Sequence, residues 1–184
     1  LMIWTTDTQK SFDYFNPQWI KFRGRKLEEE LFSGWFDGMH PEDVENFNRA
    51  FSNAFEKRNS CSLIYRLKKN DGEYRWINNY CYPRYDSDGN FAGYIGFAID
   101  ITEIRQTQER VDLQLKALET IKYGIIICNE KKQIEWVNPA FTEIMGYSLN
   151  EVQGKRPEEV IRSHLCKADF YESLDKTIIS GNIW

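Results

Sequence analysis

The sequence predicts an α+β fold that is present once in full and once in part. Three observations support this prediction: one segment recurs 122 positions later, one stretch has apolar residues at helical spacing, and the stretch after it alternates between polar and apolar residues. A helix followed by strands of this kind is typical of an α+β module of about 100 residues. The 184 residues of the chain therefore hold one such module and the first part of another.

The repeat begins at an Asn-Pro pair. Segment 16–29 continues from Asn-Pro with an aromatic residue, a glycine and Leu-x-Glu, and segment 138–151 repeats this pattern at each of those positions. An apolar strand that ends in Asn-Pro predicts a short helix beginning at the proline. Gly24 and Gly146 would end that helix, because glycine adopts the left-handed C-cap conformation at little cost. We therefore expect the two segments to have the same fold.

A basic run and an acidic run lie close together in the first copy. The basic run 21–26 is expected to be a solvated helix end rather than a nucleic-acid patch, since the chain as a whole has a net charge of -4. The acidic run 28–30 is expected to be a solvated helix start rather than a metal site. Neither nucleic acid nor a metal ion is expected as a partner.

A longer helix and three strands complete the first copy. His40-Pro41-Glu42-Asp43 opens this helix, with proline and acidic residues in its first turn. Its apolar face consists of Val44, Phe47, Phe51 and Phe55. The strands are expected over 60–69, 74–85 and 91–101, and they are separated by Asn-Asp-Gly and Asp-Ser-Asp-Gly turn signals.

A helix without Gly or Pro is predicted over 103–121, between the two copies. Ile104, Val111 and Leu118 recur every seven residues along it, which is the spacing of a coiled-coil seam. An amphipathic helix packed on its own domain would explain the same spacing. Both interpretations remain open at this point.

Three regions follow from these elements. Residues 1–103 form the complete module, residues 104–121 form the linker helix, and residues 122–184 form the first part of the second copy. A second copy of full length would run to roughly position 222, so the three-strand portion is the part expected to be absent.

The motifs resemble those of the PAS domain family, the sensor modules of bacterial signalling proteins. They are Phe15-Asn16-Pro17, His40-Pro41-Glu42-Asp43, Tyr65-Arg66-Leu67, Asp71-Gly72-Glu73, Gly93-Tyr94-Ile95-Gly96 and Asp100-Ile101-Thr102-Glu103. The resemblance implies a five-stranded antiparallel sheet in the order 2-1-5-4-3, with helices over one face enclosing a pocket. It also implies that the last motif, the PAC motif, passes a signal onward, so Asp100, Thr102 and Glu103 are candidate transmission residues.

Strand alternation separates the candidate pocket from the outer face. The pocket candidates are Leu63, Tyr65, Leu67, Ile77, Asn79, Cys81, Tyr94, Gly96 and Ala98. The opposite face carries Trp76, Tyr80, Ile95, Phe97 and Ile99. The buried amide of Asn79 needs a partner, which can be a ligand, water or an internal group. The outer face is apolar enough that a helix or a second subunit should cover it.

No cofactor is required by the sequence, and neither flavin nor haem is expected. The Asn-Cys-Arg-Phe run of the light-sensing flavin relatives is absent, and Cys61 and Cys81 are expected to be packing residues on strands. The long helix of the first copy has no histidine to ligate haem. His164 and Trp184 of the second copy are weak candidates for haem and flavin, respectively.

Composition excludes several function classes. No apolar run approaches the roughly 18 residues of a membrane span, and four scattered cysteines with no C-x-x-C pair favour a reducing compartment. No nucleophile, phosphate-loop or paired-carboxylate pattern is recognisable, so no catalytic residue is assigned. A soluble, cytoplasmic binding or interaction module is therefore favoured over an enzyme.

The expected function is that of a cytoplasmic sensory and dimerisation segment, with a sensor histidine kinase as the parent chain. A cyclic-di-nucleotide synthase or hydrolase is the alternative parent, and a stand-alone small-molecule-binding protein is a third interpretation. A homodimer through the linker helix or the outer sheet face is expected. At the start of the linker, the Thr102 hydroxyl would cap the helix and Asp100 would pair with Arg75 or Arg105.

Overall fold

The structure is a computed structural model that describes residues 1–161, 173, 176–177 and 180. The chain divides into two compact units, Leu1–Gln108 and Glu109–Trp184, and the division falls inside the long helix α4 (Thr102–Thr120). Each unit is described by itself below. Among the described residues, no helix combines the length and the apolar character needed to cross a membrane.

The first unit contains the predicted five-stranded antiparallel sheet. Its strands are β1 (Met2–Thr6), β2 (Phe12–Phe15), β3 (Cys61–Lys68), β4 (Tyr74–Tyr85) and β5 (Phe91–Asp100). Their order is β2-β1-β5-β4-β3, which confirms the order that the family resemblance implied. The turns at 70–72 and 86–89 contain Gly72 and Gly89 with positive φ, as the two turn signals predicted.

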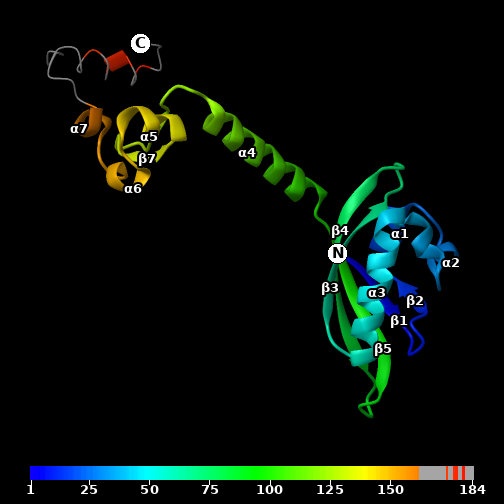
Figure 1. Cartoon of the computed structure of the whole chain (residues 1–184). Helices are drawn as coiled ribbons and strands as arrows, with labels where there is room; N and C mark the ends of the chain where they lie inside the picture. Colours follow the sequence, from blue (N-terminus) through cyan, green and yellow to red (C-terminus); the bar gives the residue numbers. More distant parts are fainter. Residues whose placement is uncertain (162–172, 174–175, 178–179, 181–184) are drawn as a thin grey trace. The chain divides into compact units, whose positions relative to one another are not determined.

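Short and long helices cover one face of this sheet (Figure 1). They are α1 (Pro17–Arg23), α2 (Leu27–Glu30), the 3-10 helix η1 (Gly34–Gly38) and α3 (Pro41–Lys57). The predicted face of α3 is buried at Phe47, Phe51 and Phe55, and Val44 packs at its edge. The core thus lies between α3 and the inner face of the sheet.

The second unit contains a hairpin and short helices. They are β6 (Ile126–Cys128), β7 (Ile134–Val137), α5 (Pro139–Met145), α6 (Leu149–Val152) and α7 (Pro157–Ile161). The two strands pair antiparallel, and Ile134, Val137, Phe141 and Val152 form a small core beneath them. The described part therefore matches the first elements of the complete module.

The repeated strand-to-helix connection is confirmed atom by atom. Asn16 Oδ1 accepts the backbone N–H groups of Ile3 and Trp19, both at 3.0 Å. Asn138 Oδ1 accepts those of Ile125 and Phe141, at 2.8 and 3.0 Å, and each partner lies 122 positions after its counterpart. Gly24 and Gly146 end the two helices with φ of 67° and 75°. The same side chain therefore joins the first strand to the first helix in both copies.

The expectation of solvated charged runs holds for Lys21, Lys26, Glu28 and Glu29, which are exposed, and is wrong for one residue of each run. Arg23 and Glu30 are buried, whereas the basic and acidic runs that contain them were expected to be solvated. The reason is tertiary: Glu30 lies against Arg23 and Arg25, with Nε to carboxylate oxygen distances of 3.1 and 3.3 Å. Trp19 Nε1 donates a further bond of 2.8 Å to Glu30. Local charge alone could not reveal this network.

Candidate functional site

The structure brings the predicted pocket residues together on the inner face of the sheet. Leu63 is partly exposed, and the other members of the set are buried. They face α3 and the loops before it, as strand alternation predicted. Their role as ligand contacts stays a prediction, whereas their position in the core is a structural fact.

Aromatic side chains fill much of this interior. Trp35 lies at the centre, with ring centroids 4.7 Å from Phe12, 5.2 Å from Phe47 and 6.1 Å from Tyr65. Trp4, fully buried on β1, lies 4.9 Å from Phe12. Edge-on and tilted ring pairs of this kind pack densely and fix side-chain rotamers.

Asn79 finds its partner inside the protein. Its Oδ1 accepts a hydrogen bond of 2.9 Å from Trp4 Nε1, and both side chains are buried. This satisfies the indole donor and the amide oxygen without a ligand. Sequence reasoning singled out Asn79 but not Trp4, which lies 75 residues earlier and has no local signal that links the two.

Two donors in the same interior lack a partner among the described residues: Trp35 Nε1 and the Tyr65 hydroxyl. Both side chains are 1% exposed, and burial raises the pKa of Tyr65 well above its ordinary value. A buried polar group left unpaired costs about 1–3 kcal/mol. These two donors are therefore polar groups of the interior that the described residues leave unsatisfied, unlike Trp4 and Asn79.

Tyr94, another predicted pocket residue, is engaged by the end of α3. Its hydroxyl lies 2.8 Å from the carbonyl oxygen of Ala54 and 2.6 Å from that of Asn59. Burial raises the pKa of Tyr94 to about 12, so the hydroxyl keeps the proton that it donates. Tyr94 therefore ties the last strand, β5, to the helix that covers the sheet.

The end of β5 is joined to β4 and to α4 by a compact set of hydrogen bonds. Asp100 Oδ1 accepts the N–H of Thr102 at 2.9 Å, and Thr102 Oγ1 accepts the N–H of Trp76 at 2.8 Å. The N–H of Ile101 donates to the carbonyl oxygen of Trp76 at 2.8 Å. The guanidinium of Arg105 stacks on the Trp76 ring, 4.1 Å from its centroid. We call Trp76, Asp100, Thr102 and Arg105 the β5–α4 junction.

This geometry corrects two expectations. Thr102 does not use its hydroxyl to cap its own helix; the hydroxyl bonds the neighbouring strand, and the carboxylate of Asp100 accepts the first-turn N–H instead. The two arginines expected to pair with Asp100 have other partners. Arg75 pairs with Asp71 and Glu73, and Arg105 stacks on Trp76. Glu103 is exposed in the first turn of α4, where the positive end of the helix dipole favours its charge.

A charge cluster at the start of α3 was not predicted as such. Arg66 of β3 donates to Asp43 from its backbone N–H, Nε and Nη2 at 2.8 to 2.9 Å, and to Glu42 from Nη2 at 2.8 Å. The hydrogen bonds from Arg66 hold the pKa values of both carboxyl groups below their ordinary range. The cluster therefore fixes α3 to the sheet that it covers.

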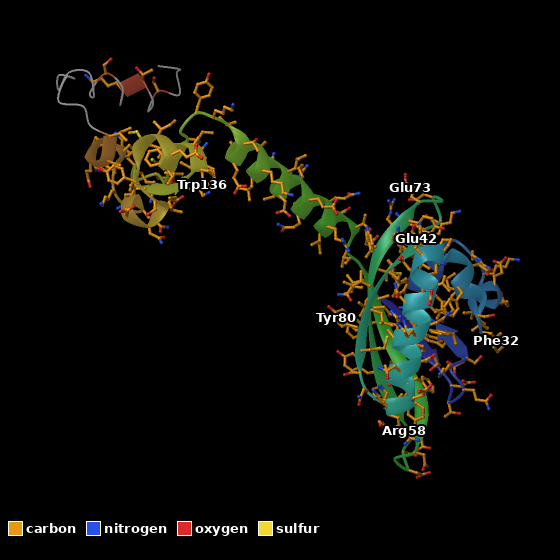
Figure 2. The ribbon with its side chains drawn as sticks, in the orientation of Figure 1. Phe32, Glu42, Arg58, Glu73, Tyr80 and Trp136 are labelled. Carbon is orange, nitrogen blue, oxygen red and sulfur yellow. The ribbon has the colours of Figure 1, made fainter. Side chains whose placement is uncertain are left out.

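The outer face of the sheet carries exposed apolar side chains. Tyr80 stacks on Phe97 with centroids 5.0 Å apart, and Ile95 and Ile99 are 41% and 40% exposed. Figure 2 shows Tyr80 on the side of the sheet away from α3, and Phe32 on the other flank of the unit. At Trp76, the guanidinium groups of Arg105 and Arg66 lie over the ring, 4.1 and 5.2 Å from its centroid, and cover part of that face.

Among the cofactor candidates, Cys81 is buried and Cys61 partly buried, so the expectation of packing cysteines on strands holds for position and burial. His164 and Trp184 lie outside the described residues. His40 caps α3, with Nδ1 accepting the N–H of Glu42 at 3.3 Å.

Each of the two units is matched by a protein-family model. The family described as PAS fold matches residues 12–98, and the family described as PAS domain matches residues 113–178. The uncharacterized protein y4lL of Sinorhizobium fredii is 36% identical over 109 residues, which are 59% of this chain and 13% of that protein. The methyl sulfide methyltransferase-associated sensor of Methanosarcina acetivorans is 31% identical over 100 residues, which are 52% of this chain and 10% of that protein. The chain therefore spans a small part of the length of these relatives.

Solved structures show the same fold. The N-terminal domain of a diguanylate cyclase with PAS/PAC sensor from Marinobacter aquaeolei is 27% identical, with a TM-score of 0.51 over 56% of this chain and 97% of that chain. A sensory box histidine kinase/response regulator from Burkholderia thailandensis is 20% identical, with a TM-score of 0.50 over 65% of this chain and 91% of that chain.

Proposed function

Because the chain belongs to the PAS family and carries two of its modules in tandem, we propose that it is the sensory and dimerisation segment of a bacterial signalling protein with a histidine kinase output. The observation that carries this proposal is the β5–α4 junction. Asp100 and Thr102 bind the last strand, its neighbour β4 and the first turn of α4 in one hydrogen-bonded unit. A displacement of β5 therefore changes the angle at which α4 leaves the module.

The input of this segment is proposed to be a small polar molecule in the interior of the first module. Support comes from Trp35 Nε1 and the Tyr65 hydroxyl, which are buried donors without a partner among the described residues. A ligand with acceptor groups would satisfy these donors, and the aromatic rings around them would contact its apolar part. Native mass spectrometry of the purified chain tests this point, because a bound molecule would add a fixed mass that denaturation removes.

The assembly is proposed to be a homodimer in the cytoplasm, formed through α4 or the outer sheet face. Supporting this, α4 exposes Ile104, Val111 and Leu115, and the sheet exposes Ile95 and Ile99. A second copy of the chain would remove both surfaces from water. The free thiols of the described residues suit a reducing compartment.

A cyclic-di-nucleotide synthase is the second candidate parent, because the structure from Marinobacter aquaeolei at 27% identity comes from a diguanylate cyclase with a PAS/PAC sensor. The two candidates differ in product. A kinase would transfer phosphate from radiolabelled ATP to its own chain, as a label that acid removes and base does not. A synthase would convert GTP to a cyclic dinucleotide and leave the chain unlabelled. A parent protein with neither activity would overturn both proposals.

A further inference from the structure

Two cysteines face each other across the edge strand β3 and its neighbour β4 in the first unit. Cys61, the first residue of β3, is the direct register partner of Cys81 in β4, and both thiols are free. Directly opposed residues of an antiparallel pair have Cα atoms about 4.5 or 5.5 Å apart, depending on the pair type. Both values lie within the range of about 4.4–6.8 Å that a disulfide spans. A bond between the two sulfurs therefore needs little backbone movement.

The two thiols are unequal in a way that suits oxidation. The Cys81 thiol donates a hydrogen bond of 3.9 Å to the carbonyl oxygen of Asn79. The neighbouring Cys81 thiol lowers the pKa of Cys61, whereas the neighbouring Cys61 thiol and burial raise the pKa of Cys81. Cys61 is partly exposed at the start of its strand, whereas Cys81 is fully buried. Cys61 is thus the more exposed thiol and the one with the lowered pKa. Cys81 is buried and keeps its proton.

We propose that Cys61 and Cys81 form a peroxide-reactive dithiol site that closes into a cross-strand disulfide. The Cys61 thiolate attacks one oxygen of hydrogen peroxide and the O–O bond breaks. The other oxygen departs as hydroxide, and Cys61 becomes a sulfenic acid. The Cys81 sulfur then attacks the Cys61 sulfur, the S–O bond breaks, and the hydroxyl group leaves as water with the proton of Cys81. The hydroxide takes up the proton that Cys61 had lost. In total, two thiols lose two electrons and one peroxide becomes two waters.

The new bond would act on a row of residues that crosses the sheet. Cys81 is also the register partner of Gly96 in β5, and Gly96 is the partner of Trp4 in β1. The contact at Gly96 is close, since a Cβ there would lie 2.1 Å from Cζ2 of the Trp4 ring. Cross-strand Cβ atoms lie about 4.5–5.5 Å apart, while those of a disulfide lie about 3.5–4.5 Å apart. Formation of the disulfide therefore draws β3 toward β4, which is the neighbour of β5, the strand that ends at Asp100. An effect of this shift on signalling rests on the proposed sensory function.

The oxidation is tested on the full chain with Cys128→Ser and Cys166→Ser, which leaves only the proposed pair. After hydrogen peroxide treatment, the protein is denatured, alkylated with iodoacetamide and weighed by mass spectrometry. We expect a species that has lost two hydrogens, takes up no alkyl group and regains both alkylation sites after dithiothreitol. Two alkylated thiols after oxidation, or a disulfide between two chains, would overturn the proposal.

Single variants in the same background assign the two roles. With Cys81→Ser the reaction should stop at a sulfenic acid on Cys61, which dimedone traps. With Cys61→Ser, Cys81 should react with peroxide at least about tenfold more slowly, because it is buried and protonated. Equal reactivity of the two variants in the folded state, checked by circular dichroism, would contradict the assignment. The readout is thiol chemistry alone, so it is independent of the output activity of the parent protein.

Discussion

The hydroxyl of Thr102 accepts the backbone N–H of Trp76 across 2.8 Å, which joins the first residue of α4 to a strand that lies 26 positions earlier in the chain. Asp100 accepts the N–H of Thr102 in the same unit. Thr102 thus takes part both in an Asx-type cap and in a hydrogen bond between α4 and β4, so α4 leaves the sheet in a defined direction.

The buried carboxylate of Glu30 should be a large contributor to the stability of the first unit. Glu30→Gln would leave Arg23 buried without its counter-charge, and breaking a buried pair in this way typically costs about 3–5 kcal/mol. Glu28→Gln in the same short helix is the matched control, because Glu28 is exposed, and it should change the free energy of unfolding by less than about 0.5 kcal/mol. Urea unfolding measures both, and equal losses would contradict the buried network.

Asp43 should make stability depend on pH at the acid end. Hydrogen bonds from Arg66 hold the folded-state pKa of Asp43 below its ordinary value of 3.8, so its contribution is present above that pH and is lost as pH falls through the folded pKa. Asp43→Asn should therefore lower the free energy of unfolding at pH 7 by about 1–3 kcal/mol. The gap to the unmodified protein should close as pH drops below 3.8. Glu45 is exposed on the same helix, so Glu45→Gln should have the same free energy of unfolding as the unmodified protein both at pH 7 and below pH 3.8.

Asn138 should hold the last turn of α4 within the second unit. Its Nδ2 lies 2.9 to 3.3 Å from the carbonyl oxygens of Leu118, Ile121 and Tyr123, whereas Asn16 Nδ2 contacts only that of Leu1. Asn138→Asp keeps the acceptor and replaces the donor with a charged oxygen, so amides 117–121 should exchange hydrogen about tenfold faster, a change of about 1.4 kcal/mol. Asn16→Asp is the control and should leave these amides unchanged. Unaltered exchange in both variants would show that Asn138 does not hold the helix end.

The strands, the turns and the repeated connection could be predicted from the sequence because each rests on local chemistry. Alternation placed the inner face, and Asn-Pro with a glycine seven residues after the proline placed the short helices. The partners of Glu30, Asn79 and Thr102 could not be predicted, because each lies on another element brought near only by folding. Asn79 and Trp4, for example, are 75 residues apart and share no local pattern. The sequence correctly predicted that the buried amide of Asn79 needs a partner, but only the fold identifies Trp4 as that partner.

The outer sheet face should mediate self-association. Ile99→Glu would place a carboxylate on the exposed apolar face and should weaken dimerisation at least about tenfold. Phe32→Glu is the control: Phe32 is 66% exposed on the other flank of the unit, so this variant should associate as the unmodified chain does. Sedimentation velocity over a concentration series measures the effect. A chain that remains monomeric at all concentrations, or two variants that behave alike, would contradict this assignment.

The most direct test of signal transmission through the β5–α4 junction uses the full-length parent protein and its output activity with and without stimulus. Asp100→Ala and Thr102→Ala remove the acceptor and the hydroxyl that form the junction, while Asp100→Asn and Thr102→Ser retain them. We predict that the two alanine variants stay folded but lose the response to stimulus, and that the two conservative variants keep it. Folded alanine variants with a normal response would contradict the account and reduce the junction to a structural cap.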